Sequence, residues 1–190
     1  METRGSTTHL HQQDSATPVR LTVPVTRRDH HSGPIRAIAH LLEYGDFECP
    51  ACGQAHFLVK EIQEAMGRRL CFTFRNFPLA NVHPHSECAA EAAEAAAAQS
   101  RYWEMHDMLF EHQRALDEED IAAYAAALGL DRTRLFRELE SGIYEPRVHE
   151  DYVSGIRNGV NETPSFFING VRYDGPLEVD AMVKALKEKL

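Results

Sequence analysis

Hydrophobic and polar positions follow one another along the chain in a pattern that predicts strands and helices in a definite order. Residues 35–44 form a nearly continuous apolar run, which is typical of a strand buried on both faces. From Pro50 to Met66 the apolar residues recur at helical spacing and predict a helix, which Gly67 ends. Residues 70–74 alternate and predict a second strand. Strand, helix and strand in this order form a βαβ unit, so we expect the two strands to be parallel.

The second half of the chain predicts a helical block, a hairpin and a closing helix. Residues 85–158 are rich in alanine and contain several helix-capping residues, which together predict a set of helices. Ser165–Ile168 and Val171–Tyr173 flank Asn169-Gly170, the strongest short-range hairpin signal, and are expected to pair as strands. Residues 177–190 predict an amphipathic helix. The order indicates an α/β protein.

The N-terminal residues 1–34 are polar and punctuated by proline and glycine, without helical periodicity. We expect this segment to be an arm that is partly flexible. Its short apolar run at residues 19–25 is a candidate for an added strand at a sheet edge.

Composition and charge narrow the function classes. The chain has 190 residues, with 20 Lys and Arg against 29 Asp and Glu, and a formal net charge of −9. An acidic chain binds phosphate backbones poorly, so no nucleic-acid partner is expected. No apolar run approaches the roughly 18 residues that a membrane span requires. Residues 1–20 contain no apolar stretch typical of a secretory signal, so we expect a cytoplasmic protein without a membrane partner.

Two of the four cysteines form a motif. Cys49 and Cys52 are separated by two residues at the start of the predicted helix, whereas Cys71 and Cys88 stand alone. A zinc ribbon would require a second such pair. The motif therefore favours thiol redox chemistry over a structural metal, and plain packing remains an alternative. For Cys71 and Cys88 we expect buried packing positions, with a regulatory disulfide as the alternative.

Five separate stretches of the sequence resemble those of one known family. They are DHHSGP at 29–34, EYGDFECPAC at 43–52, FRNFPL at 74–79, YWEMHDMLF at 102–110 and ETPSFFING at 162–170. Each is similar to a stretch of the bacterial DsbA-like thiol–disulfide oxidoreductases of the thioredoxin superfamily. The resemblance implies a thioredoxin fold with an α-helical subdomain inserted between the second and third core strands.

This fold divides the chain into four parts. An N-terminal arm at 1–34 precedes the first part of the thioredoxin fold at 35–84, which carries the CxxC motif. The helical insertion occupies 85–158. The second part of the fold, at 159–190, holds the proline loop, the hairpin and the last helix.

The resemblance assigns chemistry to particular residues. Thiol–disulfide exchange requires a thiolate that attacks and a second thiol that resolves the mixed disulfide. Cys49 is expected to attack, because a helix N-terminus lowers the pKa of a thiol, and Cys52 is expected to resolve. The two together form the redox-active disulfide. Glu43 matches the family's buried acid, which implies that it exchanges a proton with Cys52.

Three further positions refine this assignment. Thr163 and Pro164 match the family's cis-proline site, which implies that they dock the substrate peptide. Ala51 replaces the histidine that DsbA carries inside the motif, so we expect Cys49 to be less acidic than in DsbA. Glu48 either raises the pKa of Cys49 slightly or is simply solvated.

The resemblance implies a thiol–disulfide oxidoreductase that acts on disulfides of proteins or small thiols. We expect no bound cofactor and no metal, and electrons exchange with an unidentified thiol redox partner. In a cytoplasm the expected direction is reduction of the substrate. The alternatives are an oxidant or isomerase in an oxidising compartment, a non-catalytic peptide-binding or chaperone-like module, and a metal-binding sensor built on the cysteines and nearby histidines.

Overall fold

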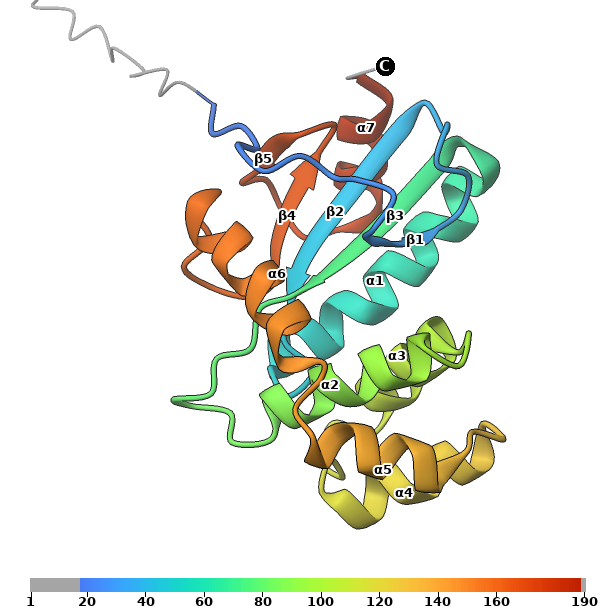
Figure 1. Ribbon diagram of the computed structural model, residues 1–190. Coiled ribbons are helices and arrows are strands. Elements are labelled where there is room, and N and C mark those ends of the chain that lie inside the picture. Colours follow the sequence, from blue (N-terminus) through green and yellow to red (C-terminus); the bar gives the residue numbers. More distant parts are fainter. Residues whose placement is uncertain (1–17, 189–190) are drawn as a thin grey trace, which may run out of the picture.

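A central five-stranded sheet organises the molecule, as the computed structural model of residues 18–188 shows (Figure 1). The strands are β1 (His30–Ser32), β2 (Ala39–Gly45), β3 (Leu70–Asn76), β4 (Ser165–Ile168) and β5 (Val171–Tyr173). Their spatial order is β1-β3-β2-β4-β5. β2 and β3 are parallel, as the βαβ pattern predicted, and the other neighbours are antiparallel. The hairpin between β4 and β5 is also confirmed.

Helices cover both faces of the sheet and extend beyond one end of it (Figure 1). They are α1 (Pro50–Met66), α2 (Ser86–Ala97), α3 (Tyr102–Glu111), α4 (Glu118–Ala127), α5 (Arg132–Glu140), α6 (Glu145–Arg157) and α7 (Val179–Glu188), with a short 3-10 turn at Gly67–Arg69. The helix predicted from Pro50 to Met66 is confirmed at both ends. Helices α2 to α6 all fall within residues 85–158. In residues 18–188, none of the helices combines the length and hydropathy needed to cross a bilayer.

The side chains of β2 alternate between two hydrophobic cores. Leu41 belongs to the larger core, which continues through α1 and α7 into the helical block, and Glu43 shares its face. Leu42 and Tyr44 belong to a smaller core on the other face. Burial on both faces explains the continuous apolar run, but the strand starts at Ala39 rather than at residue 35. The reason is a turn after Pro34, whose carbonyl oxygen accepts a hydrogen bond from the amide of residue 37.

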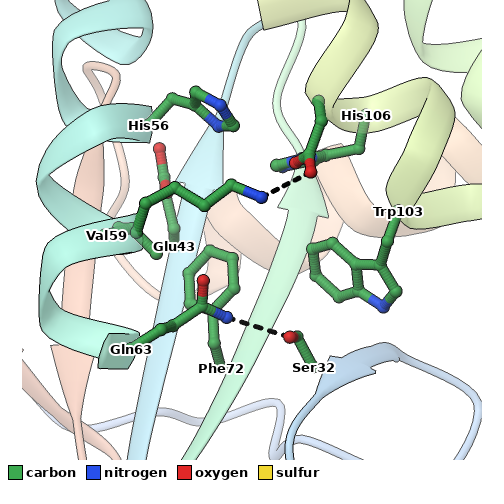
Figure 2. A pocket seen from close by; sticks show the side chains of 10 residues that line it. Ser32, Glu43, His56, Val59, Gln63, Phe72, Trp103 and His106 are labelled. Carbon is green, nitrogen blue, oxygen red and sulfur yellow. Dashed lines mark hydrogen bonds and ion pairs between the residues drawn. The ribbon is translucent and has the colours of Figure 1, made fainter. Parts of the chain in front are cut away.

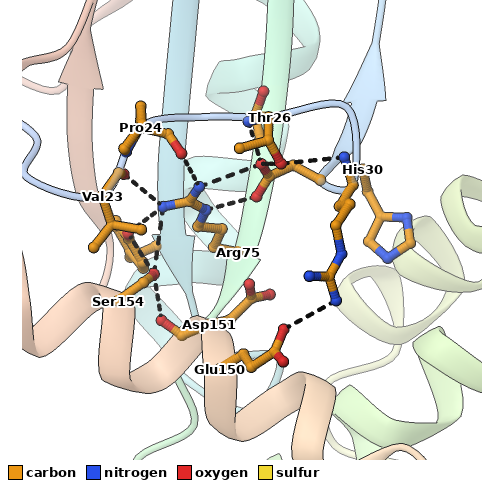
Figure 3. A network of polar contacts seen from close by, with 12 residues as sticks. Val23, Pro24, Thr26, His30, Arg75, Glu150, Asp151 and Ser154 are labelled. Carbon is orange, nitrogen blue, oxygen red and sulfur yellow. Dashed lines mark hydrogen bonds and ion pairs between the residues drawn. The ribbon is translucent and has the colours of Figure 1, made fainter.

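The described part of the arm, from residue 18 onward, is docked on the sheet. Arg75 donates to both carboxylate oxygens of Asp29, at 2.7 and 3.2 Å, and to the carbonyl oxygens of Val23 and Pro24 (Figure 3). The apolar run at 19–25 makes only an isolated bridge, from Arg20 to β5, and no regular strand. The segment 1–17 lies outside the described residues, so the expectation of flexibility there stays a prediction.

Candidate active site

The CxxC motif lies where β2 passes into α1. Cys49 is the N-cap of α1, with an extended backbone, and Pro50 occupies the first turn, where its missing N–H costs no hydrogen bond. Cys49 is 7% exposed and Cys52 is fully buried. The thiol expected to attack thus lies at the cap, and the one expected to resolve is enclosed a turn later.

The surroundings of Cys49 favour its thiolate. A hydrogen bond from Cys52 contributes most, and the side chain of Thr163 and the backbone N–H groups of Ala51 and Cys52 add to it. Together they outweigh burial and lower the pKa of Cys49 from 9.0 to about 5. In the thiol form, Sγ of Cys49 instead donates to the carbonyl oxygen of Thr163 at 3.4 Å.

The surroundings of Cys52 and Glu43, by contrast, favour their protonated forms. Burial raises the pKa of Cys52 well above its usual value, and the hydrogen bond to Cys49 and the charge of Glu43 act in the same direction. Burial, followed by the negative charge of Cys49, raises the pKa of Glu43 to about 8. One thiolate, one thiol and one carboxylic acid therefore coexist near pH 7.

The substrate-docking pair predicted at Thr163 and Pro164 lies against the motif. The peptide bond between these two residues is cis. The hydroxyl of Thr163 is buried and has no hydrogen-bond partner among the described residues other than the nearby sulfur. The structure thus brings Cys49, Cys52 and Thr163 together, with Glu43 on the strand behind them.

Two supporting residues, Gln113 and Asp46, escaped the sequence analysis. Gln113 donates from one amide nitrogen to the carbonyl oxygens of Phe47 and Cys49, both at 2.8 Å. Asp46 accepts from the ring of His83 at 2.8 Å. A glutamine after a predicted helix carries no local signal for such a role, because its partners lie more than sixty positions away.

Glu48 is bound rather than simply solvated. Its carboxylate accepts from the amide of His85 at 2.6 Å and contacts the ring of the same residue at 2.9 Å. The histidines at 83 and 85 therefore tie the loop after β3 to the segment before Cys49 through two carboxylates. This pairing fits a positioning role for the loop better than a metal site.

Behind the cysteines, α1 and α3 enclose a polar cavity (Figure 2). His56, His106 and Asp107 bring candidate metal-ligand atoms within 4.8 Å of one another there. The set does not fit a metal centre, however. One oxygen of Asp107 is already paired with the ammonium group of Lys60, and the other accepts from His106 at 3.1 Å.

The two remaining cysteines differ from each other. Cys71 is buried in β3, as expected for a packing residue, with its sulfur 3.7 Å from a ring nitrogen of His31. Cys88 is exposed near the start of α2, so the expectation that it is buried was wrong. The helix turns that side of α2 toward solvent, which the alanine-rich pattern around Cys88 does not reveal. All four cysteines are free thiols in this structure.

Solved structures with the same fold include three redox proteins. A thioredoxin-like oxidoreductase from Silicibacter pomeroyi has a TM-score of 0.76 and 24% identity, over 86% of this chain and 92% of that one. BdbD from Bacillus subtilis, in its oxidised form, has a TM-score of 0.79 and 19% identity, over 92% and 97%. The thiol-disulfide exchange protein alpha-DsbA2 from Wolbachia pipientis has a TM-score of 0.76 and 18% identity, over 85% and 87%. These likenesses establish the fold.

Curated relatives at higher identity are longer proteins. The Na(+)/H(+) antiporter NhaA 3 of Salinispora tropica is 41% identical over 169 residues, which are 88% of this chain and 26% of the antiporter. The antiporter NhaA 1 of Mycobacterium sp. (strain KMS) is 39% identical over 175 residues, 90% and 28% of the two chains. This chain thus spans about a quarter of the length of these relatives, and ion transport is a property of those whole proteins.

The family itself follows from a match over most of the chain. A protein-family model described as Thioredoxin matches residues 26–188, which include both cysteines of the motif, Glu43 and the cis-proline loop. The chain therefore belongs to the thioredoxin family, within which it has the fold of the DsbA-like thiol–disulfide oxidoreductases.

Proposed function

We propose that this chain is a thiol–disulfide oxidoreductase in which Cys49 attacks the substrate disulfide and Cys52 resolves the mixed disulfide. The observation that carries the proposal is that the pKa values of two thiols one helical turn apart are shifted in opposite directions. The pKa of Cys49 is lowered to about 5, whereas that of Cys52 is raised. A buried packing pair would have no cause for such a difference.

The first step forms the mixed disulfide. The Cys49 thiolate attacks one sulfur of the substrate disulfide, a new S–S bond forms, and the other substrate sulfur leaves as a thiolate that takes a proton from water. The carbonyl oxygen of Thr163 lies 3.4 Å from the attacking sulfur. An extended substrate segment therefore has a backbone acceptor beside the reacting atoms.

The second step needs a base for Cys52. Formation of the mixed disulfide removes the charge of Cys49, which is one of the two causes that raise the pKa of Glu43. Glu43 then loses its proton more readily, and its carboxylate takes the proton of Cys52. The Cys52 thiolate attacks Sγ of Cys49, the second substrate sulfur leaves, and the protein ends with a Cys49–Cys52 disulfide.

We further propose the reductive direction in a cytoplasm. Glutathione and thioredoxin keep cytoplasmic thiols reduced, so an oxidised Cys49–Cys52 pair is returned to the dithiol by a thiol partner. The pKa of Cys49, about 5, lies between the roughly 7 of thioredoxin and 3.5 of DsbA. A pKa above that of DsbA is expected from Ala51, because the loss of the motif histidine makes the reduced form less stable than in DsbA.

Two measurements test the proposal. Turnover of an insulin disulfide by the full chain with dithiothreitol should be abolished by Cys49→Ser, and Cys52→Ser should accumulate a mixed disulfide at Cys49. The reduction potential, measured with Cys71→Ala and Cys88→Ser, decides the direction. A value near about −270 mV supports a reductase, and a value at or above about −180 mV assigns an oxidant or isomerase instead.

A non-catalytic peptide-binding module is the remaining candidate, because the cis-proline loop places the carbonyl oxygen of Thr163 beside Cys49, where an extended segment could bind. Under that function, Cys49→Ser would leave peptide binding unchanged and the wild type would not turn over insulin. Cys49→Ser and the wild type therefore separate the two functions.

A further inference from the structure

A small polar cavity lies between α1, α3 and the sheet, on the face of β2 that carries Glu43. It has a volume of about 40 Å³. Its lining comprises Ser32, Glu43, His56, Val59, Lys60, Gln63, Phe72, Trp103, His106 and Asp107. Figure 2 shows Glu43 and His56 on one side of this space, with His106 facing them from α3.

Three buried polar atoms in this lining lack hydrogen-bond partners among the described residues. They are Oε1 of Glu43, Nε2 of His56 and Nε2 of His106. The three residues are 2%, 4% and 3% exposed, so bulk water does not reach their side chains. A cavity of 40 Å³ has room for at least one water molecule, and these atoms supply the two to four polar partners that a buried water requires.

The cavity connects to the surface through α3. Nδ1 of His106 bonds to Oδ1 of Asp107 at 3.1 Å, and the other carboxylate oxygen is paired with Lys60. The side chains of Lys60 and Asp107 are 44% and 29% exposed. A chain of groups that can each take and release a proton therefore runs from solvent to the cavity that Glu43 lines.

We propose that this cavity is the proton path of Glu43, in which water and the imidazoles of His106 and His56 carry protons between the buried carboxyl and Asp107 at the surface. The inference rests on the proposed function, because it supplies the exit for the proton that Glu43 must lose before it can accept one from Cys52. His56 and His106 act through Glu43 and are positioning residues.

The proton balance of the path is closed. Nε2 of His106 receives a proton from Glu43 through water, and Nδ1 releases its own proton to Asp107, which passes it to bulk water. The imidazole changes tautomer. It is restored when the Cys49–Cys52 disulfide is reduced again, because Cys52 then takes the proton of Glu43 and a proton passes inward from Asp107 through His106 to Glu43. Bonds between heavy atoms and oxidation states do not change in this transfer.

The charges around the cavity suit this role. Burial lowers the pKa of His56 to about 4 and also lowers that of His106, so both rings are neutral near pH 7 and each has one donor and one acceptor nitrogen. Burial alone would raise the pKa of Asp107, but hydrogen bonds from His106 and Lys60 lower it. Cys49, Cys52 and Tyr102 also interact electrostatically with Glu43.

A double-mutant cycle tests the path. The Cys49–glutathione mixed disulfide of the full chain is prepared, and its resolution by Cys52 is followed between pH 5 and 9 through the fluorescence of Trp103, the single tryptophan, which lines the cavity. His106→Gln should slow resolution on the order of tenfold near pH 7 and increase its solvent isotope effect, a smaller loss than that of a direct acid–base group. In a Glu43→Gln background the same change should have no further effect. Ser32→Ala, which breaks only the hydrogen bond to Gln63 in the same cavity, is the matched control.

Further variants and measurements distinguish the proton path from a structural role of His106 and from a metal site. Asp107→Asn tests the partly exposed end of the path, because it removes the carboxylate that takes the proton of His106, and it should slow resolution as His106→Gln does. An equal loss in both Glu43 backgrounds would mean that His106 is merely structural and would overturn the proposal. Tight zinc binding by the oxidised wild type, lost in His106→Gln, would overturn it in favour of a metal site.

One readout does not depend on enzymatic activity. In protein labelled with ¹³C at its glutamate carboxyl carbons, the Glu43 signal of the wild type should stay sharp during a pH titration, because its carboxyl proton exchanges rapidly with solvent. In His106→Gln the same signal should broaden, because proton exchange is slower. If the wild type resolves no mixed disulfide, the proposed function fails, and this measurement still decides the path. An unchanged Glu43 signal in His106→Gln would refute it.

Discussion

The sulfur of Cys49 lies 3.4 Å from the carbonyl oxygen of Thr163, across a separation of 114 positions in the chain. The N-terminus of α1 and the loop before β4 meet because β4 pairs antiparallel with β2, the strand that leads into the CxxC motif. The nucleophile and the backbone that can align a substrate are therefore adjacent at one end of the sheet.

Alkylation kinetics should reveal an acidic thiol. Because the pKa of Cys49 is lowered to about 5, the rate of its reaction with iodoacetamide should follow a titration curve centred near pH 5. At pH 7 Cys49 should be almost entirely thiolate. Cys52 should stay unmodified, since it is buried and its pKa is raised. Peptide mass mapping identifies the modified residue. A midpoint near pH 8.5 would contradict the structure.

Thr163→Val should make Cys49 less acidic. The buried hydroxyl of Thr163 is one of the groups that lower the pKa of the sulfur, and valine keeps the shape while removing the donor. The absorbance of the thiolate near 240 nm, followed during pH titration, measures the shift. Thr22→Val, in the arm away from the motif, is the control and should leave the midpoint in place.

Glu43 should make stability fall as the pH rises. Its folded pKa, raised to about 8, lies above its usual value of 4.5, so its contribution to stability is complete below pH 4.5 and is lost as the pH rises toward 8. The slope is at most about 1.4 kcal/mol per pH unit. Urea unfolding in a Cys49→Ser background removes the contribution of Cys49, whose lowered pKa acts in the opposite direction. Burial, the larger cause, still raises the pKa of Glu43 in that background. Glu43→Gln should flatten the dependence, and an unchanged slope would show that Glu43 is not buried in its neutral form.

Gln113→Met should loosen the segment around the motif. The variant removes both hydrogen bonds to the carbonyl oxygens of Phe47 and Cys49 while nearly keeping the side-chain volume. The change leaves the carbonyl oxygen of Cys49 with its helical bond from the amide of Gly53 and takes the amide partner from that of Phe47, which should cost about 1–3 kcal/mol of unfolding free energy. Urea unfolding measures the loss. Gln99→Met, at a half-buried position whose hydrogen bonds to Asp131 are exposed to solvent, should cost less, and equal losses would argue against a clamp at Gln113.

Arg75→Met should release the arm. Arg75 is 3% exposed, and its loss leaves the buried carboxylate of Asp29 without its ion pair, which typically costs about 3–5 kcal/mol. Limited proteolysis between residues 18 and 29 and urea unfolding should both report the change. Arg28→Met removes an exposed pair with Glu150 and should cost less than about 1 kcal/mol. If the two variants were equally stable, the arm would not depend on Arg75.

Much of the fold could be predicted from local pattern. The apolar run before Gly45 and the helix from Pro50 to Met66 follow from periodicity and from the residues that end elements. The start of β2 could not be placed, because residues 35–38 are as apolar as a strand but belong to a turn after Pro34. Ile35 and Ile38 are exposed there, so hydrophobicity alone gave the wrong boundary.

By itself, the sequence determined which residues can carry thiol chemistry and in what order the elements follow. The spacing of Cys49 and Cys52, and their place at a helix start, are local properties of the chain. Only the tertiary structure decided that Gln113 clamps the motif and that His106 and Glu43 line one cavity. Those contacts arise from the packing of α3 against α1 and the sheet, and no local pattern specifies which polar side chains such packing encloses.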